Sequence, residues 1–359
     1  MRIAILVPNM DIGGVQTFAA SLTKFLALNT NFQIDFIVFS GALDEKYFFL
    51  KEFENVNIHF LQKKQGFSLK FITDLRKIIK KLKPDIINTH SSRTIRYLFL
   101  LRLCRKIKIV HIITNNPRIY NKKLYWLYKK RLHQKTWNNL NIVGISDKVS
   151  TIFSSVYQYP LEKISTIYNG VDYPSFDNSG EKVFDFVTCG SLVPIKNQSF
   201  LLESFASMGS CNSTLAILGD GPLMEKLKEE AIELGIYDRL VFFGRVENPF
   251  EILKKSKVFI LTSISEGNPI SVVEAMSQGL PVIAPAVGGI PDLITDGVNG
   301  RLFEPNLTST DVGSLMRKML EMPEDIFKVI SANNREAASR WDINKTGAQY
   351  VELFEELSK

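Results

Sequence analysis

The sequence predicts an α/β protein with two domains, each built on a doubly wound parallel sheet. Two observations support this prediction. Short apolar runs alternate along the chain with helix-like stretches of about 10–15 residues, which is the pattern of βαβ units. Many of these runs are apolar at nearly every position, as expected for strands buried on both faces of a parallel sheet. The chain has 359 residues, and at roughly 100–200 residues per domain this is enough for two.

In the N-terminal half, Ile3–Val7 is a continuous apolar run that predicts a first strand, and a helix is expected over 15–28. A second helix is expected over 68–82, because apolar residues recur there at helical spacing until Pro84 ends the pattern. Further strands are expected at 34–39, 85–90, 107–113 and 141–146.

The C-terminal half repeats the alternation. Helices are expected over 197–208 and 223–234, and Gly235 follows the second of them at the position where a glycine commonly ends a helix. Strands are expected at 184–189, 215–218, 240–243, 258–261 and 281–284.

The segment 169–180 is rich in Asn, Asp, Gly, Pro and Ser, which favour turns, and we expect the hinge between the domains there. The expected domains are 1–173 and 174–342, and a final helix over about 343–359 is expected to pack back on the first domain. Ligands of open parallel sheets bind outside the carboxyl ends of the strands. A functional site is therefore expected in a cleft between these ends.

The composition excludes several classes of protein. Hydrophobic residues make up 45% and charged residues 23% of the chain, which is typical of a globular protein and excludes a disordered chain. No apolar run approaches the roughly 18 residues of a membrane-spanning helix. Three widely spaced cysteines (Cys104, Cys189 and Cys211) form neither a disulfide framework nor a metal motif. We therefore expect a reducing, cytoplasmic setting.

Charge is divided unevenly between the halves. Residues 1–180 contain 27 Lys and Arg against 12 Asp and Glu, whereas the remainder contains 17 against 25. Residues 102–135 contain eleven Lys and Arg and no acidic residue. Basic residues beside aromatic ones suit an anionic membrane surface, and a solvated helix face is the equal alternative. Such clusters also bind nucleic acid, but nucleic acid is not expected as a partner here. The residues expected at a membrane are Lys122, Lys123, Tyr125, Trp126, Lys129 and Lys130.

The segment 265–276 carries the clearest chemistry. Asn268 is a favourable N-cap and Pro269 suits the first position of a helix, so a helix is expected to begin there. Its first free N–H groups, at Ile270 and Ser271, form an anion site suited to a diphosphate. A carboxylate on this helix, Glu274, can accept hydrogen bonds from the two hydroxyls of a ribose. Two simpler explanations remain open: Glu266 can merely complement the helix dipole, and Ser271, Glu274 and Gln278 can form a solvated stripe.

The pair Glu266 and Glu274 resembles the Glu-x7-Glu motif of the retaining family-4 glycosyltransferases, which have the GT-B fold of two Rossmann-like domains. The similarity extends over nearly the whole chain, because six further segments match family motifs in the correct order. These segments are Gly13-Gly14-Val-Gln16, Asn169-Gly-Val-Asp172, Gly190–Asn197, Leu218–Pro222, Phe243–Val246 and Gly279–Pro291.

The resemblance implies roles for individual residues. Lys196 and Glu266 are the implied catalytic groups, with Lys196 neutralising the leaving diphosphate. Glu274 is implied to bind the donor ribose, and Gly14 to let the main chain approach the phosphates closely. The other implied donor-binding residues are Ser191, Arg245, Val246, Gly267, Asn268, Ile270 and Ser271.

The sequence also departs from the family pattern. Ser191 stands where the family usually has Arg, and Gln16 where it often has Glu. Many members have a histidine just after the strand at 107–113, where this chain has Thr114 and Asn115. His111 within that strand is expected to pack in the core. The residues implied on the acceptor side are Gln16, His90, Arg93 and Asn115.

The expected function is transfer of a hexose from a nucleotide sugar, with UDP as the expected nucleotide, to a hydroxyl of a glycan or glycolipid. The family implies retention of the anomeric configuration, and the expected setting is capsule, lipopolysaccharide or other envelope glycan synthesis at the inner face of a bacterial membrane. The chain has no Asp-x-Asp motif and no histidine spacing for a metal, so no metal or cofactor is expected; the nucleotide sugar is a substrate. The alternatives are a sugar-nucleotide epimerase of the same fold and a non-catalytic protein that binds nucleic acid or membrane.

Overall fold

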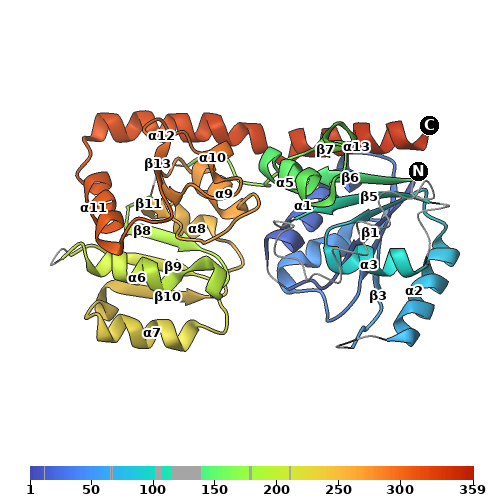
Figure 1. Ribbon diagram of the computed structural model, residues 1–359, viewed down its shortest axis with the longest axis horizontal. Helices are drawn as coiled ribbons and strands as arrows, with labels where there is room; N and C mark the ends of the chain where they lie inside the picture. Colours follow the sequence, from blue (N-terminus) through green and yellow to red (C-terminus); the bar gives the residue numbers. More distant parts are fainter. Residues whose placement is uncertain are drawn as a thin grey trace. The chain divides into compact units, whose positions relative to one another are not determined.

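The computed structural model describes residues 1–11, 13–64, 66, 68–101, 107–114, 139–177, 180–209 and 212–359. The chain forms two compact units (Figure 1). Unit 1 comprises Met1–Gly170 together with Ile343–Lys359, and unit 2 comprises Val171–Asp342. Each unit contains a parallel sheet with helices packed on it, so the predicted α/β fold with two Rossmann-like domains is confirmed.

The sheet of unit 1 has the strand order β3-β2-β1-β4-β5-β6-β7, and all of its strand pairs are parallel. Strand order reverses between β1 and β4, where Ile5 pairs with Asn88. The strands are β1 (Arg2–Val7), β2 (Gln33–Val38), β3 (Val56–Phe60), β4 (Ile86–Thr89), β5 (Lys108–Ile113), β6 (Leu140–Gly144) and β7 (Ile164–Thr166). The helices are α1 (Gly14–Asn29), η1 (Glu45–Glu52), α2 (Leu69–Leu82), α3 (Ser92–Leu101), α5 (Asp147–Tyr157), η5 (Leu161–Lys163) and α13 (Ile343–Ser358).

The last helix, α13, packs against α1 within unit 1 (Figure 1). The ring of Tyr350 lies 5.9 Å from that of Phe18, and Tyr350 is fully buried. Gly347 lets the helices approach closely, because a Cβ there would lie 2.1 Å from the ring of Phe25. Helix α13 is therefore part of the core of the first unit.

The sheet of unit 2 has the order β10-β9-β8-β11-β12-β13 and is also parallel throughout. The strands are β8 (Phe184–Cys189), β9 (Leu215–Leu218), β10 (Leu240–Gly244), β11 (Ser256–Ile260), β12 (Val282–Pro285) and β13 (Gly300–Phe303). The helices are η6 (Pro194–Lys196), α6 (Gln198–Ala206), α7 (Met224–Glu233), η7 (Tyr237–Arg239), α8 (Phe250–Leu253), α9 (Ile270–Ser277), α10 (Ile290–Leu293), α11 (Ser309–Leu320), α12 (Glu324–Ala338) and η8 (Ser339–Trp341).

The core of unit 2 joins one face of the sheet to α6, α7 and α11. Phe186 and Ile260 from the strands are completely buried against Leu201, Leu227 and Met316 from these helices. Burying a large aliphatic or aromatic side chain contributes roughly 1.5–3 kcal/mol. This rigid body carries the loops that follow its strands.

Three strands were not predicted from the sequence: β3, β7 and β13. Each lies at an edge of its sheet, where one side of the strand has no neighbouring strand among the described residues. Polar residues are therefore tolerated, as in the half-exposed strand β3 with Asn57 and His59, and no continuous apolar run marks the strand.

A buried carboxylate joins three strands of unit 1. The Asp35 side chain on β2 is 1% exposed; its Oδ2 accepts from Arg2 Nε at 2.6 Å, and its Oδ1 lies 2.8 Å from His59 Nε2. Burial alone would raise the pKa of Asp35, but the hydrogen bonds from His59 and Arg2 lower it below its usual value. The ionised carboxylate is thus held in place by two partners.

We predict that Asp35→Ala lowers the free energy of unfolding at pH 7 by about 1–2 kcal/mol, because it removes two charge-assisted hydrogen bonds whose donors, on Arg2 and His59, are half-exposed and can bind water instead. The pKa of Asp35 is lowered in the folded state. The contribution of its carboxylate to stability is therefore complete above the unfolded pKa of about 3.9 and is lost as the pH falls through the pKa of the folded state. Urea unfolding at pH 7 and at pH 3 measures both effects. Glu54→Ala, at an exposed site, is the control and should change stability by less than about 0.5 kcal/mol.

Candidate functional site

Two loops of unit 2 meet at the carboxyl ends of the neighbouring strands β8 and β11. Lys196, at the end of η6, donates from Nζ to Glu266 Oε1 at 2.5 Å. The main chains are joined as well, because Ile264 N donates to Ile195 O at 2.9 Å. The hydroxyl of Thr262 also donates to Asn197 O at 3.0 Å. The structure therefore brings together the two residues implied to be catalytic.

The Lys196–Glu266 ion pair is shielded from water. The Glu266 side chain is 8% exposed and that of Lys196 is 23% exposed. Charge–charge interactions at such a site are screened less than at an open surface. A cation and a carboxylate in direct contact form a site that can accept a phosphate on one side and sugar hydroxyls on the other.

The loop after β8 is held from both sides. Gly219, after β9, has φ +138°, and a Cβ there would lie 1.9 Å from Gly190 O. On the other side, Gln198 Nε2 donates to Ser191 O at 3.0 Å. Ser191 itself is exposed. The positioning roles of Gln198 and Thr262 were missed from the sequence, because a single polar residue beside a loop carries no recognisable pattern.

Helix α9 begins at Ile270, with Pro269 as its N-cap and no hydrogen bond from a capping side chain. The prediction that Asn268 is the N-cap and Pro269 the first helical residue was therefore wrong by one residue. Pro269 has ψ 107°, which is extended, so the chain turns into the helix only after it. The first N–H groups of a helix lack intrahelical acceptors, so those of α9 can bind an anion.

Glu274 lies inside α9 and is only 7% exposed, and Gln278 is 2% exposed. The alternative that these residues form a solvated stripe is therefore wrong. Arg245 and Val246 directly follow β10 at the same end of the sheet; Arg245 is exposed and Val246 half-buried. All the residues implied to bind the donor from unit 2 lie at or after the carboxyl ends of parallel strands.

The residues of unit 1 that are implied to contact the donor or the acceptor lie on several separate elements. Gly14 is the exposed first residue of α1, and Gln16 Nε2 donates to Asn9 Oδ1 at 2.6 Å. Asn9 donates in turn to Asp11. Arg93 lies in α3. Asn115 and the six residues expected at a membrane lie outside the described residues.

His90 directly follows β4 and is completely buried, with its ring 5.7 Å from that of Phe18. Neither ring nitrogen has a hydrogen-bond partner among the described residues. Burial, with a smaller effect from nearby His111, lowers the pKa of His90 to about 3. His111 is 2% exposed, so the prediction that it packs in the core is confirmed. Burial also lowers the pKa of His111 to about 3.

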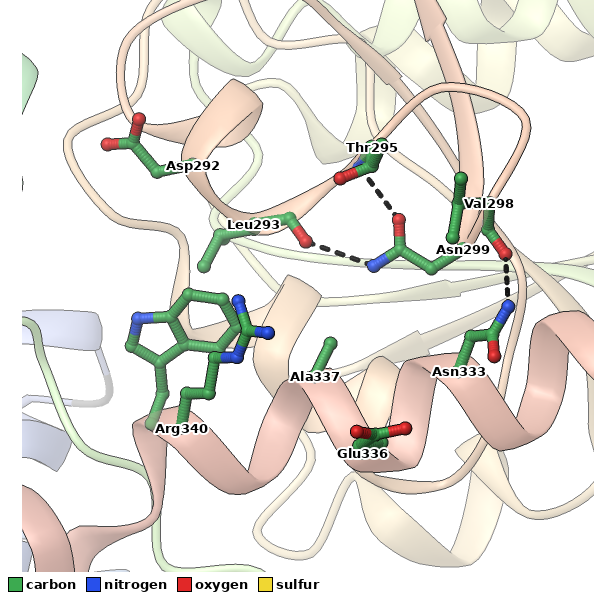
Figure 2. Close-up of a pocket in the computed structure, with 10 residues that line it drawn as sticks. Asp292, Leu293, Thr295, Val298, Asn299, Asn333, Glu336, Ala337 and Arg340 are labelled. Carbon is green, nitrogen blue, oxygen red and sulfur yellow. Dashed lines mark hydrogen bonds between the residues drawn. The ribbon is translucent and has the colours of Figure 1, made fainter.

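A separate cavity of about 190 Å³ lies in unit 2 between α10, the loop that follows it, α12 and η8 (Figure 2). None of its lining residues was predicted to be functional. Its amide side chains instead stabilise the loop: Asn299 Nδ2 donates to Leu293 O at 3.0 Å, and Asn333 Nδ2 donates to Val298 O at 2.9 Å (Figure 2). We interpret this cavity as a feature of the loop rather than as the functional site.

Two searches of the described residues were negative. Within this part of the chain, no cluster of three or more His, Cys, Asp or Glu side chains could hold a metal ion. No helix among the same residues has the length and apolar character required to cross a bilayer.

Comparison with known proteins defines the class. Residues 12–173 match the family model "Glycosyltransferase Family 4", and residues 172–337 match "Glycosyl transferases group 1". The chain is 31% identical over 291 residues to the UDP-Gal:alpha-D-GlcNAc-diphosphoundecaprenol alpha-1,3-galactosyltransferase of Escherichia coli, covering 74% of each chain. It is 24% identical, over 99% of each chain, to a Campylobacter jejuni alpha-1,4-N-acetyl-D-galactosaminyltransferase whose acceptor is a GalNAc-GalNAc-diNAcBac-PP-undecaprenol.

The solved structures show the same fold. HepE of Anabaena, crystallised with UDP and glucose, superposes with a TM-score of 0.83 at 19% identity over 99% of this chain and 100% of that one. The apo form of WaaB, a lipopolysaccharide outer core galactosyltransferase, has a TM-score of 0.72 at 20% identity over 99% and 100% of the chains. The protein is a glycosyltransferase of GT-B fold. It belongs to glycosyltransferase family 4.

We predict that burial of His90 makes the protein sensitive to acid. Its pKa is about 3 in the folded state and about 6.5 in the unfolded chain. Between these pH values the unfolded chain binds one more proton, so the free energy of unfolding decreases by about 1.4 kcal/mol for each unit by which the pH is lowered. His90→Phe keeps an aromatic ring beside Phe18 and should remove this contribution. Unfolding free energies at pH 7, 6 and 5 provide the test; equal slopes for the two proteins would contradict it.

Proposed function

We propose that the protein transfers a hexose from a UDP-sugar to a hydroxyl of a lipid-linked or lipopolysaccharide glycan, with retention of the anomeric configuration and without a metal ion. The observation that carries the proposal is the shielded Lys196–Glu266 pair, followed eight residues later by the buried Glu274 on α9. Relatives named for UDP-galactose and for undecaprenol-diphosphate acceptors support the choice of donor and acceptor.

In this proposal the protein supplies positioning and charge rather than a nucleophile. The Lys196 ammonium and the first N–H groups of α9 bind the diphosphate, and the Glu266 carboxylate accepts hydrogen bonds from the donor sugar. Glu274 accepts from the ribose hydroxyls. As the bond from the anomeric carbon to the phosphate oxygen breaks, the diphosphate gains charge, and Lys196 stabilises that charge most in the transition state.

The acceptor hydroxyl attacks the face of the sugar from which the diphosphate departs, and its proton passes to the departing phosphate oxygen. This course retains the anomeric configuration and requires no protein base. It also agrees with the position of Glu266, whose carboxylate is already engaged by Lys196.

We further propose that the protein docks on an anionic membrane through its basic half. The described part of that half contains a basic helix face on α2, made of Lys70, Arg76, Lys77, Lys80 and Lys81, all exposed. The opposite side of α2 is anchored by buried Phe71, Leu75, Ile79 and Leu82, and Leu69 at its start is 70% exposed. An amphipathic helix of this kind suits a headgroup surface.

The function is tested by screening UDP-galactose, UDP-glucose and UDP-N-acetylglucosamine for binding and for transfer to an undecaprenyl-diphosphate-linked sugar. Glu274→Ala should weaken UDP binding tenfold or more, because each hydrogen bond to a charged group contributes about 1.5–3 kcal/mol. Calorimetry measures the affinity, and Glu233→Ala on the exposed face of α7 is the matched control.

Four outcomes would contradict the proposal in whole or in part. The first is the absence of UDP binding, and the second is epimerisation or hydrolysis of the donor without transfer to any acceptor. The third is loss of transfer when a metal chelator is added, which would show that the reaction requires a metal ion. An inverted anomeric centre in the product, read by NMR, would refute retention alone.

Membrane docking is tested by sedimentation with phosphatidylglycerol vesicles. Each cation near an anionic surface contributes about 1 kcal/mol, so reversing Lys77, Lys80 and Lys81 to Glu should weaken binding by about 100-fold or more. Reversing Lys226, Lys318 and Lys328, exposed on unit 2, changes the net charge equally and should have little effect. Equal losses in the two variants would show that net charge alone controls binding.

A further inference from the structure

The loop that carries Glu266 packs against a second loop of unit 2. Strands β11 and β12 are parallel neighbours, with Ile260 opposite Ile283. The chain therefore leaves both strands at the same end of the sheet. Gly288, in the loop after β12, lies directly against the main chain of Glu266.

The contact is a close approach of two backbones. A Cβ on Gly288 would lie 1.7 Å from Glu266 O, 2.7 Å from Glu266 C and 3.3 Å from Glu266 N, and these are its three nearest atoms. Real Cβ atoms do not approach a carbonyl oxygen so closely. Any other residue here must therefore push the two main chains, its own and that of Glu266, apart, because the obstacle is backbone and cannot change rotamer.

Gly288 also has φ +57°, and this alone favours glycine. The two effects can be separated within the same unit. Gly235, after α7, has φ +66°, but a Cβ on it would have no neighbour within 4 Å in the described part of the chain. Gly235 thus shares the backbone conformation of Gly288 without its contact.

The displacement should remain local. On one side, helix α9 is fixed in the core, because Val272, Val273 and Met276 are completely buried, so Glu274 cannot follow a shift at Glu266. Gly267 stands between Glu266 and this fixed part, and a glycine absorbs changes in φ and ψ easily. On the other side, the side chain of Lys196 is long and flexible, so its ammonium can bind the carboxylate after a shift or a phosphate in its place.

We propose that Gly288 is a positioning residue for the donor sugar: by lacking a Cβ, it sets the place of the Glu266 main chain and hence of its carboxylate. The inference rests on the proposed function, in which Glu266 holds the sugar and Glu274 the ribose. Gly288 then controls the sugar half of the donor site and not the nucleotide half. A misplacement of about 1 Å at a reacting centre can lower the rate about 100-fold.

The test compares Gly288→Ala with Gly235→Ala for binding of UDP, UDP-glucose and UDP-galactose by calorimetry, and for transfer. Gly288→Ala should weaken, by tenfold or more, the binding of whichever UDP-hexose the unchanged protein uses as donor. It should slow transfer about 100-fold and leave the affinity for UDP unchanged within about twofold. Gly235→Ala should leave all of these values unchanged. Loss of UDP binding in Gly288→Ala, whether by unfolding or by distortion of the whole unit, would overturn the proposal.

A double-mutant cycle with Glu266→Gln tests whether Gly288 acts through Glu266. If it does, the two losses in transfer are strongly non-additive, because the second change acts on a group that is already disabled. Additive losses would refute the positioning role. Failure of the unchanged protein to bind UDP or either UDP-hexose would instead refute the proposed function, and the two failures are therefore distinguishable.

Discussion

The ion pair between Lys196 and Glu266 is the interaction on which the arrangement of the donor loops depends. It joins loops that follow two neighbouring parallel strands, and the hydrogen bonds of Ile264 and Thr262 reinforce the same junction. Parallel strands make such a junction possible, since they deliver both loops to one end of the sheet. The opposite charges neutralise each other inside a shielded site, where either charge alone would be costly.

Much of the fold could be predicted from the sequence, because strands buried on both faces are almost entirely apolar. Ile3–Val7 and Leu215–Leu218 are examples, and both are strands in the structure. The edge strands β3, β7 and β13 escaped prediction because an edge position permits polar residues. The start of α9 was displaced by one residue, since Asn and Pro both favour helix starts and local preference alone does not choose between them.

The site was less predictable than the fold. Resemblance to the family pointed to Glu266, Glu274 and Lys196, but burial of Glu274 and the contact between Lys196 and Glu266 depend on packing between distant segments. His90 shows the same limit. The resemblance implied a place on the acceptor side, and the structure adds that the ring lies within the core against Phe18. A pattern of residue types predicts which strand end a side chain occupies but not the depth at which it lies.

The place of α13 has a consequence for the order in which the chain folds during synthesis. Residues of unit 2 form one continuous segment, so that unit can fold as soon as the segment has left the ribosome. Unit 1 begins first but lacks α13 until unit 2 has been synthesised, so Phe18 and Phe25 of α1 remain until then without the partners that Tyr350 and Gly347 supply. The unit that is synthesised first is therefore completed last, and its apolar surface on α1 stays exposed to chaperones and proteases for the whole interval.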